Sequence, residues 1–330
     1  MKKIFILGQE GTGWSIDKDR FYTIKAIKSL GKYEITNNIF KADVVYAIWW
    51  NQLLNWKFKI FNKVLKKKII ATITNDLSHQ ENSIKNLIPI VDIFVYANSK
   101  QKNKLLELGV SNSSIYFNPF YVDEDIFKSI SISKKDICDK FDINYEKIKN
   151  KKLIGSFQRD SLGVDLLKPK WQKDPDMLIS ILNKLDKDLF ILLLAGPRRH
   201  YIVSECIKYG IEYIFIGNES YIKDNKDDIK VNSIGIEDMP YLYNLIDLYI
   251  VSSKSEGGPK AIPESVLCNT PILSTDVGFA KDLLDDENLY KDSEEAVLKI
   301  NNLSVNSQVS KYYSFSLFKK RIEKILKGLD

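Results

Sequence analysis

The chain has 330 residues, which is enough for two domains of ordinary size, each with its own core. A hydrophobic content of 44% and a charged content of 28% are typical of a soluble globular protein, and no apolar run of about 18 residues predicts a membrane-spanning helix. Three widely separated cysteines without Cys-x2-Cys spacing argue against a zinc site and a disulfide framework, so a cytoplasmic location is expected.

An apolar strand over residues 3–8 opens the chain, and a glycine-bearing loop that contains Gly13 connects it to a helix over about residues 19–30. This opening is Rossmann-like, but it lacks the full Gly-x-Gly-x-x-Gly pattern, so a nicotinamide cofactor is not supported. The alternation of strands and helices that follows predicts a parallel, doubly wound α/β sheet. Its further strands are expected near residues 44–48, 68–74, 92–96 and 114–117.

The net charge of +6 at pH 7 is unevenly distributed, because between Asp43 and Asp76 there are six lysines and no acidic residue. Within the segment from Trp49 to Lys68 we expect a helix over about residues 52–66, with an apolar face on the sheet and lysines on the far side. Two interpretations remain open: a core helix with a solvated basic back, or a helix that docks on an anionic membrane through Trp56. Nucleic acid is not an expected partner, because no recognised binding module surrounds these lysines.

Residues 118–127 read Asn-Pro-Phe-Tyr-Val-Asp-Glu-Asp-Ile-Phe and precede a polar, lysine-rich stretch. On its own, the Asp-x-Asp within them invites a metal–carboxylate interpretation. The polar stretch is typical of a connection between domains. We therefore expect a first domain over residues 1–128, a second over residues 129–311, and an amphipathic terminal helix within residues 312–330.

The second domain is expected to begin with a strand over residues 152–157, which leads into Gln158-Arg159. His200 is expected at the start of a helix rather than in the chemistry, and a loop around Gly235 precedes another short helix. Further strands are predicted near residues 189–195, 213–216 and 230–234.

The stretch over residues 248–278 is predicted to form a strand, a polar loop, a helix and a second strand. The pair Gly257-Gly258 lets the backbone come close to a ligand. The helix is expected to begin near Pro259 or Lys260, and the unpaired N–H groups of its first turn would stabilise an anion there. The pattern predicts a phosphate-binding loop.

Glu256 and Glu264 frame this loop, with seven residues between them. Glu-x7-Glu with a glycine pair after the first glutamate, then Cys-Asn-Thr-Pro-Ile and Thr-Asp-Val-Gly, resembles the donor-site signature of the retaining GT-B glycosyltransferases of family 4, the glycosyl transferases group 1. Asn269 stands where the family usually has glycine, and Gly258-Pro259 replaces its commoner aromatic–glycine pair. The resemblance covers most of the second domain and little of the first.

The resemblance implies roles for the residues of the loop, position by position. Glu264 is expected to bind the donor ribose, Glu256 to lie against the donor sugar, and the glycine amides to bind the diphosphate. The substrate-binding residues assigned in this way are Glu264, Gly257, Gly258, Pro259 and Lys260.

Arg159 and Lys173 match the family's cations that hold the departing diphosphate, and Lys170 competes with Lys173 for this place. Fixed cations in a water-poor cleft stabilise developing negative charge, which gives this role its physical basis. His79 follows a strand end, and it either lies against the donor sugar, as the family often has it, or is a surface histidine. Further substrate contacts implied by the resemblance are Gly13 for donor or acceptor, and Ile234, Gly235 and Ile236 for the nucleotide base.

The resemblance also implies a GT-B fold, with two Rossmann-like domains that face a cleft and a C-terminal helix that crosses back to the first domain. It places Asp123 and Asp125 in the segment that connects the domains, not in a metal site. The expected function is retaining, metal-independent transfer of a sugar from a nucleotide-sugar donor to a glycan or lipid-linked glycan acceptor, in cell-surface polysaccharide synthesis at the inner face of the cell membrane. No cofactor is expected. The alternatives are a GT-B nucleotide-sugar epimerase and a non-catalytic protein that binds an anionic polymer or membrane.

Overall fold

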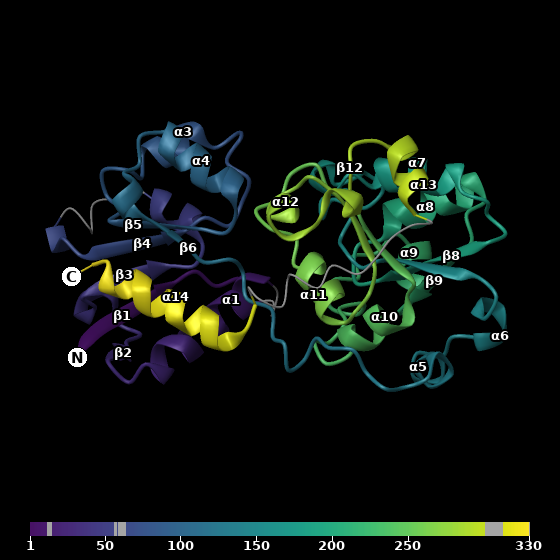
Figure 1. Cartoon of the computed structure of the whole chain (residues 1–330), viewed down its shortest axis with the longest axis horizontal. Coiled ribbons are helices and arrows are strands. Elements are labelled where there is room, and N and C mark those ends of the chain that lie inside the picture. The colour runs from purple at the N-terminus through teal and green to yellow at the C-terminus, as the bar shows by residue number, and fades with distance from the viewer. Residues whose placement is uncertain (12–14, 56–57, 59–63, 301–312, 330) are drawn as a thin grey trace. The chain divides into compact units, whose positions relative to one another are not determined.

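The structure is a computed structural model that describes residues 1–11, 15–55, 58, 64–300 and 313–329. It divides into two compact units, one formed by Met1–Tyr121 with Lys311–Asp330 and the other by Val122–Ser310. Each unit holds a six-stranded parallel sheet with helices against it (Figure 1). The predicted fold class, two Rossmann-like α/β domains, is therefore confirmed.

The first sheet has the strand order β2-β1-β3-β4-β5-β6. All four residues of β3 are buried, as expected for a central strand of a parallel sheet that is covered on both faces. Every predicted strand of this unit is present to within two residues, and among its described residues only the short edge strand β2 was not predicted. The strands are β1 (Lys2–Leu7), β2 (Tyr33–Ile35), β3 (Val44–Ala47), β4 (Lys68–Thr72), β5 (Ile93–Tyr96) and β6 (Ile115–Phe117).

The predicted continuous helix over residues 52–66 is wrong at its beginning. A 3-10 helix, η2 (Trp50–Leu54), ends there, and Asn55 is extended with φ −60° and ψ 129°. Trp50 and Leu53 are both fully buried, because side chains three residues apart share one face of a 3-10 helix. Phe58 is buried as expected, whereas residues 56–57 and 59–63, with Trp56, lie outside the described residues.

Three α-helices of the first unit precede its terminal helix in the described chain. The helix expected over residues 19–30 begins four residues earlier than predicted. Two short 3-10 helices, η1 (Ile39–Lys41) and η3 (Asn112–Ser114), lead into β3 and β6. The α-helices are α1 (Ser15–Ser29), α3 (Glu81–Lys85) and α4 (Ser99–Glu107).

The terminal helix α14 (Phe315–Lys327) returns to the first unit, as predicted. Its N-terminus is capped by Ser314, whose hydroxyl accepts a hydrogen bond from the Leu317 N–H at 3.3 Å. Figure 1 shows α14, in yellow, alongside α1. Its buried side chains share one core with Ile4 and Ile6 of β1 and with α1, and these side chains are Phe318, Ile322, Ile325 and Leu326.

The second sheet has the strand order β12-β11-β10-β7-β8-β9. All six residues of β8 are buried. The predicted strand over residues 230–234 is wrong, because this segment forms turns. The Asn232 amide donates to the Asp228 carboxylate at 2.7 Å, and its carbonyl oxygen accepts from the Asn218 N–H at 2.7 Å, so side-chain bonds replace a strand ladder. The strands are β7 (Lys152–Ser156), β8 (Phe190–Ala195), β9 (Tyr213–Ile216), β10 (Leu248–Val251), β11 (Ile272–Thr275) and β12 (Leu289–Tyr290).

Helices pack against the second sheet and connect its strands. Two 3-10 helices, η4 (Trp171–Lys173) and η5 (Asp286–Asn288), lie in its loops. Within the described ranges, no helix is long and apolar enough to span a membrane. The α-helices are α5 (Lys134–Lys140), α6 (Tyr145–Ile148), α7 (Pro175–Lys184), α8 (His200–Tyr209), α9 (Ser220–Lys223), α10 (Met239–Leu245), α11 (Ala261–Leu267), α12 (Ala280–Leu283) and α13 (Ser293–Lys299).

Truncation of Ile322 is expected to destabilise the first unit. Its side chain is fully buried in the core shared by α14, α1 and β1. Ile322→Ala removes buried methyl groups and leaves a cavity, so the free energy of unfolding should fall by about 2–5 kcal/mol in a denaturant titration. Lys324→Ala, at an exposed position of the same helix, should change it by less than about 0.5 kcal/mol. Equal effects of the two substitutions would contradict the packing of α14 on this unit.

Candidate active site

The candidate site follows from the topology of the second sheet. The chain runs from β7 outward through β8 and β9, and then returns to place β10 on the other side of β7. Leu248 of β10 pairs with Ile154, and Tyr249 pairs with Gly155. Ligands of doubly wound sheets bind outside the carboxyl ends of the strands at such a switch point. Arg159 follows β7 and the loop with Glu256 follows β10, so the fold brings these predicted residues to one edge of the sheet.

Lys173 and Glu256 form an ion pair at this edge. The Lys173 Nζ lies 2.5 Å from Glu256 Oε1, and the two side chains are only 19% and 15% exposed. The Ser253 hydroxyl donates to the same carboxylate oxygen at 2.6 Å. The Ser252 hydroxyl donates to the Lys173 carbonyl at 2.9 Å, which fixes the turn that carries the lysine. Two of the predicted catalytic residues therefore hold each other in place.

Lys170 belongs to the same group of charges. Burial, and next the neighbouring cations Arg159 and Lys173, lower the pKa of its ammonium to about 8, while Glu256 opposes them. Lys170 and Lys173 bracket the 3-10 helix η4, and the Lys173 N–H donates to the Lys170 carbonyl at 2.8 Å. We call Arg159, Lys170 and Lys173 the cation cluster. Such a cluster favours a bound polyanion, and Lys170 joins it beside Lys173 instead of replacing it.

The glycine loop after β10 is closely packed. Gly257 is buried and Gly258 is half-buried. A Cβ on Gly278, whose φ is +54°, would lie 2.9 Å from the Gly258 Cα, so the loops after β10 and β11 touch through their backbones. Helix α11 begins at Ala261 with Lys260 as its N-cap, one residue later than predicted.

Glu264 is oriented by an aromatic neighbour that the sequence did not reveal. The Tyr243 hydroxyl donates to Glu264 Oε2 at 2.9 Å. Burial, and next the Glu264 carboxylate, raise the pKa of this hydroxyl well above its usual value, so it remains a donor. Tyr243 packs against Phe157 and Tyr249, with ring centroids 5.3 and 5.4 Å away. The tyrosine lies in an apolar pattern on α10, which gives no signal of this role.

The residues predicted to bind the nucleotide base are less buried than the glycine loop. Ile234 and Ile236 are half-buried and Gly235 is exposed, on the loop that leads into α10. The Gly235 carbonyl accepts hydrogen bonds from the N–H groups of Asp238 and Met239 at 3.1 and 3.2 Å, which shape this loop.

The two histidines have different settings. His79 is exposed in a turn after β4 of the first unit, and Gly13 of that unit lies outside the described residues. His200 begins α8 as predicted, and it is buried with its Nε2 2.9 Å from the Lys226 carbonyl. Asp123 shapes a turn, because its Oδ1 accepts from the Asp125 N–H at 3.0 Å.

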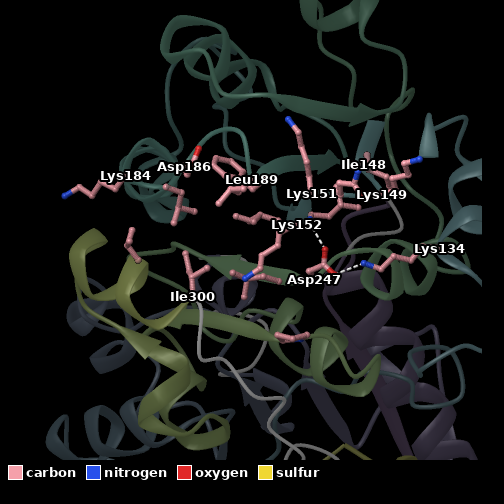
Figure 2. A pocket seen from close by; sticks show the side chains of 18 of the residues that line it. Lys134, Ile148, Lys149, Lys151, Lys152, Lys184, Asp186, Leu189, Asp247 and Ile300 are labelled. Carbon is pink, nitrogen blue, oxygen red and sulfur yellow. Dashed lines mark hydrogen bonds and ion pairs between the residues drawn. The ribbon is translucent and has the colours of Figure 1, made fainter. Parts of the chain in front are cut away.

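A cavity of about 850 Å³ lies at the opposite edge of the second sheet (Figure 2). Its lining includes Lys152, Phe190 and Leu248, the first residues of β7, β8 and β10. Lys134 at its rim is paired with Asp247 at 2.6 Å, as the dashed line shows. Because the strands are parallel, this cavity is separated from the candidate site by the length of the sheet.

Comparisons with known proteins agree with this geometry. The family model described as glycosyl transferases group 1 matches residues 145–314, more than half of the chain. No curated protein shows a significant match.

Three solved structures illustrate the likeness of fold. Alr3699/HepE of Anabaena, in complex with UDP-glucose, is 15% identical with a TM-score of 0.74 over 99% of this chain and 100% of that chain. A glycosyltransferase from Rickettsia africae is 15% identical with a TM-score of 0.71 over 100% and 99%. The lipopolysaccharide outer core galactosyltransferase WaaB is 14% identical with a TM-score of 0.59 over 100% and 98%. At these identities the likeness shows the fold alone.

The charge of Lys170 predicts a pH dependence of anion binding. Its ammonium is charged below its pKa of about 8 and neutral above it. UDP is a suitable probe, because its phosphate charge changes little above about pH 7. Between about pH 7 and pH 9, the affinity for UDP measured by calorimetry should fall about tenfold. This fall corresponds to the loss of the interaction between the Lys170 ammonium and the phosphate, which is equivalent to roughly one pKa unit. Lys170→Arg, which stays charged, should remove this fall. An unchanged pH profile in that variant would exclude Lys170 from the anion site.

Proposed function

The chain belongs to the glycosyl transferases group 1 family, and from this premise we propose that it is a retaining glycosyltransferase that uses a nucleotide-sugar donor and a glycan or lipid-linked glycan acceptor. The observation that carries the proposal is the cation cluster beside Glu256 at the β7–β10 switch point. UDP-glucose in HepE supports a nucleotide-sugar donor, and the lipopolysaccharide substrate in the name of WaaB supports a glycan acceptor. Cell-surface polysaccharide synthesis would use such a reaction.

In this proposal, the donor is held mainly by the second unit. Glu264, kept in place by Tyr243, binds the ribose hydroxyls through its carboxylate. The amides of Gly257 and Gly258 bind the diphosphate, and the neighbouring Pro259 and Lys260 complete the loop. The backbone of residues 234–236 binds the base.

The chemistry proposed for the cation cluster is stabilisation of the leaving group. When the bond between the sugar and the diphosphate breaks, negative charge grows on the phosphate oxygen. Arg159, Lys170 and Lys173 stabilise this charge more strongly than that of the intact donor, because preorganised cations act at little reorganisation cost. An acceptor hydroxyl then attacks from the face that the diphosphate leaves and gives its proton to the departing phosphate oxygen, which retains the anomeric configuration. Glu256, held by Lys173 and Ser253, lies against the sugar.

We propose that transfer needs no metal ion, because three protein cations face the diphosphate that a divalent ion would otherwise neutralise. From the first unit, His79 remains proposed as a contact of the donor sugar, and Gly13 as a contact of donor or acceptor.

Donor binding and turnover should separate in two variants. A thermal-shift screen of UDP-, GDP- and ADP-sugars should first identify a donor that stabilises the wild-type protein by mass action. Glu264→Ala should weaken the affinity for this donor by about tenfold to a hundredfold, because ribose hydroxyls lose a charged partner. Arg159→Ala should instead lower kcat by more than about a hundredfold, the equivalent of roughly 3 kcal/mol of leaving-group stabilisation.

Controls for this experiment separate the alternatives. Transfer should continue in EDTA, and full loss that magnesium or manganese restores would contradict the metal-free mechanism. Isomerised sugar without acceptor would indicate an epimerase. If no nucleotide sugar stabilised the protein in the thermal-shift screen, the result would favour the non-catalytic binding protein.

We further propose that the first unit docks peripherally on the anionic inner face of the cell membrane. Phe40 and Val64 are 68% and 73% exposed. The Lys67 ammonium donates to the Phe40 carbonyl at 3.1 Å, which brings the two segments together, and Lys41 and Lys66 beside them are exposed. Exposed apolar side chains next to lysines suit the interface of an anionic bilayer, where each lysine contributes about 1 kcal/mol.

Co-sedimentation with vesicles tests the docking. The protein should bind anionic vesicles and not neutral ones, and salt should weaken the binding. Lys66→Glu with Lys67→Glu should reduce the binding at least about tenfold. Lys28→Glu with Lys324→Glu, at exposed positions of α1 and α14, changes the net charge equally and should have a smaller effect. Lack of binding to anionic vesicles at low salt would end this proposal and leave the transferase activity unaffected.

A further inference from the structure

Arg199 and Asp160 form a buried ion pair next to the cation cluster. The side chains are 0% and 2% exposed, and Arg199 Nε lies 2.7 Å from Asp160 Oδ2. Burial raises the pKa of Asp160 to about 6 against the opposing effect of Arg199, so the charged carboxylate is held there at a cost. A buried ion pair often adds little net stability, so stability alone does not explain why this pair is present.

The Arg199 guanidinium binds the chain on both sides of Arg159. Its Nη2 donates to the Ser156 hydroxyl at 2.9 Å, and its Nη1 donates to the Gln158 carbonyl. Together with the ion pair to Asp160, the planar guanidinium therefore contacts residues 156, 158 and 160 at the end of β7. The Arg199 guanidinium therefore fixes the backbone on both sides of Arg159.

Asp160 extends this connection to the lysines. Its carbonyl accepts a hydrogen bond from the Lys170 N–H at 2.6 Å, and the Lys170 carbonyl accepts one from the Lys173 N–H at 2.8 Å. The Ser161 hydroxyl, one residue further, accepts from the Tyr201 N–H at 2.9 Å at the start of α8. The beginning of α8 is thus tied to both segments that carry the cation cluster.

We propose that Arg199, together with Asp160, is a positioning residue that holds Arg159 at the spacing from Lys170 and Lys173 that a diphosphate requires. The inference rests on the proposed function, because it assigns Arg199 to the donor site without a contact to the donor. A displacement of about 1 Å in such a site can change the rate by about a hundredfold, so the packing behind Arg159 is part of its function.

The test is a double-mutant cycle with Arg159→Ala and Arg199→Lys. UDP, GDP and ADP are titrated by calorimetry, and the nucleotide that wild type binds most tightly is used for all variants. Arg199→Lys keeps the charge but loses the fork, so it should lower the affinity about tenfold in the wild-type background. In the Arg159→Ala background the same change should cost at most about threefold, because the residue acts mainly through Arg159.

Two further variants keep the test decisive. Lys151→Met breaks the ion pair with Glu212, 2.6 Å long, near the other end of β7, and should leave nucleotide affinity unchanged. Ser156→Ala removes a single partner of the guanidinium, and it should weaken binding in the direction of Arg199→Lys even if that variant fails to fold.

The outcomes separate the inference from the proposed function. The positioning role would be overturned if a folded Arg199→Lys protein kept the wild-type nucleotide affinity. It would also be overturned if Arg199→Lys lowered the affinity equally in the wild-type and Arg159→Ala backgrounds. In either case, a lower affinity of Arg159→Ala than of wild type would still support the proposed function. If wild type binds none of the three nucleotides, the proposed function itself fails, and the inference fails with it.

Discussion

The pairing of β7 with β10 is the constraint on which the candidate site depends. This register places the ends of two strands that are distant in the sequence side by side, so that Lys173 and Glu256, 83 positions apart, form an ion pair. Because neighbouring residues of a strand point to opposite faces, a slip of one residue would move the side chains of β10 to the other face. The buried runs of both strands fix the register, and the polar loops beyond them inherit their positions from it.

Much of the fold was predictable, because strands and helices depend on local patterns. The strand predicted at the beginning of the stretch over residues 248–278 is β10 (Leu248–Val251), since a buried apolar run ends there in polar residues. The errors have local physical causes too. Asn232 binds neighbouring polar groups and turns the chain where its apolar neighbours indicated a strand. Trp50 and Leu53 are drawn into the core by a 3-10 turn, which a search for the α-helical period does not detect.

The site was predictable in its residue types and less so in its connections. The glycine loop and its two glutamates could be predicted from residues close together in the sequence, whereas the cations Arg159 and Lys173 were implied by the resemblance to the family. The partners of these groups do not, because Tyr243 reaches Glu264, and Arg199 reaches Asp160, only after the sheet has formed. The lowered pKa of Lys170 could not be predicted either, because its largest cause is burial, which depends on how the folded chain packs around the side chain. A single sequence contains no record of these long-range contacts.

The return of α14 to the first unit has a consequence for how the protein is made. β1 and α1 are synthesised before the second unit, whereas other side chains of their core, such as Phe318 and Ile322, are synthesised after it. Domains generally fold as units while the chain emerges. Here the second unit can fold first, while the first unit keeps apolar surface uncovered until α14 is synthesised. The order of folding would then reverse the order in which the two units are translated.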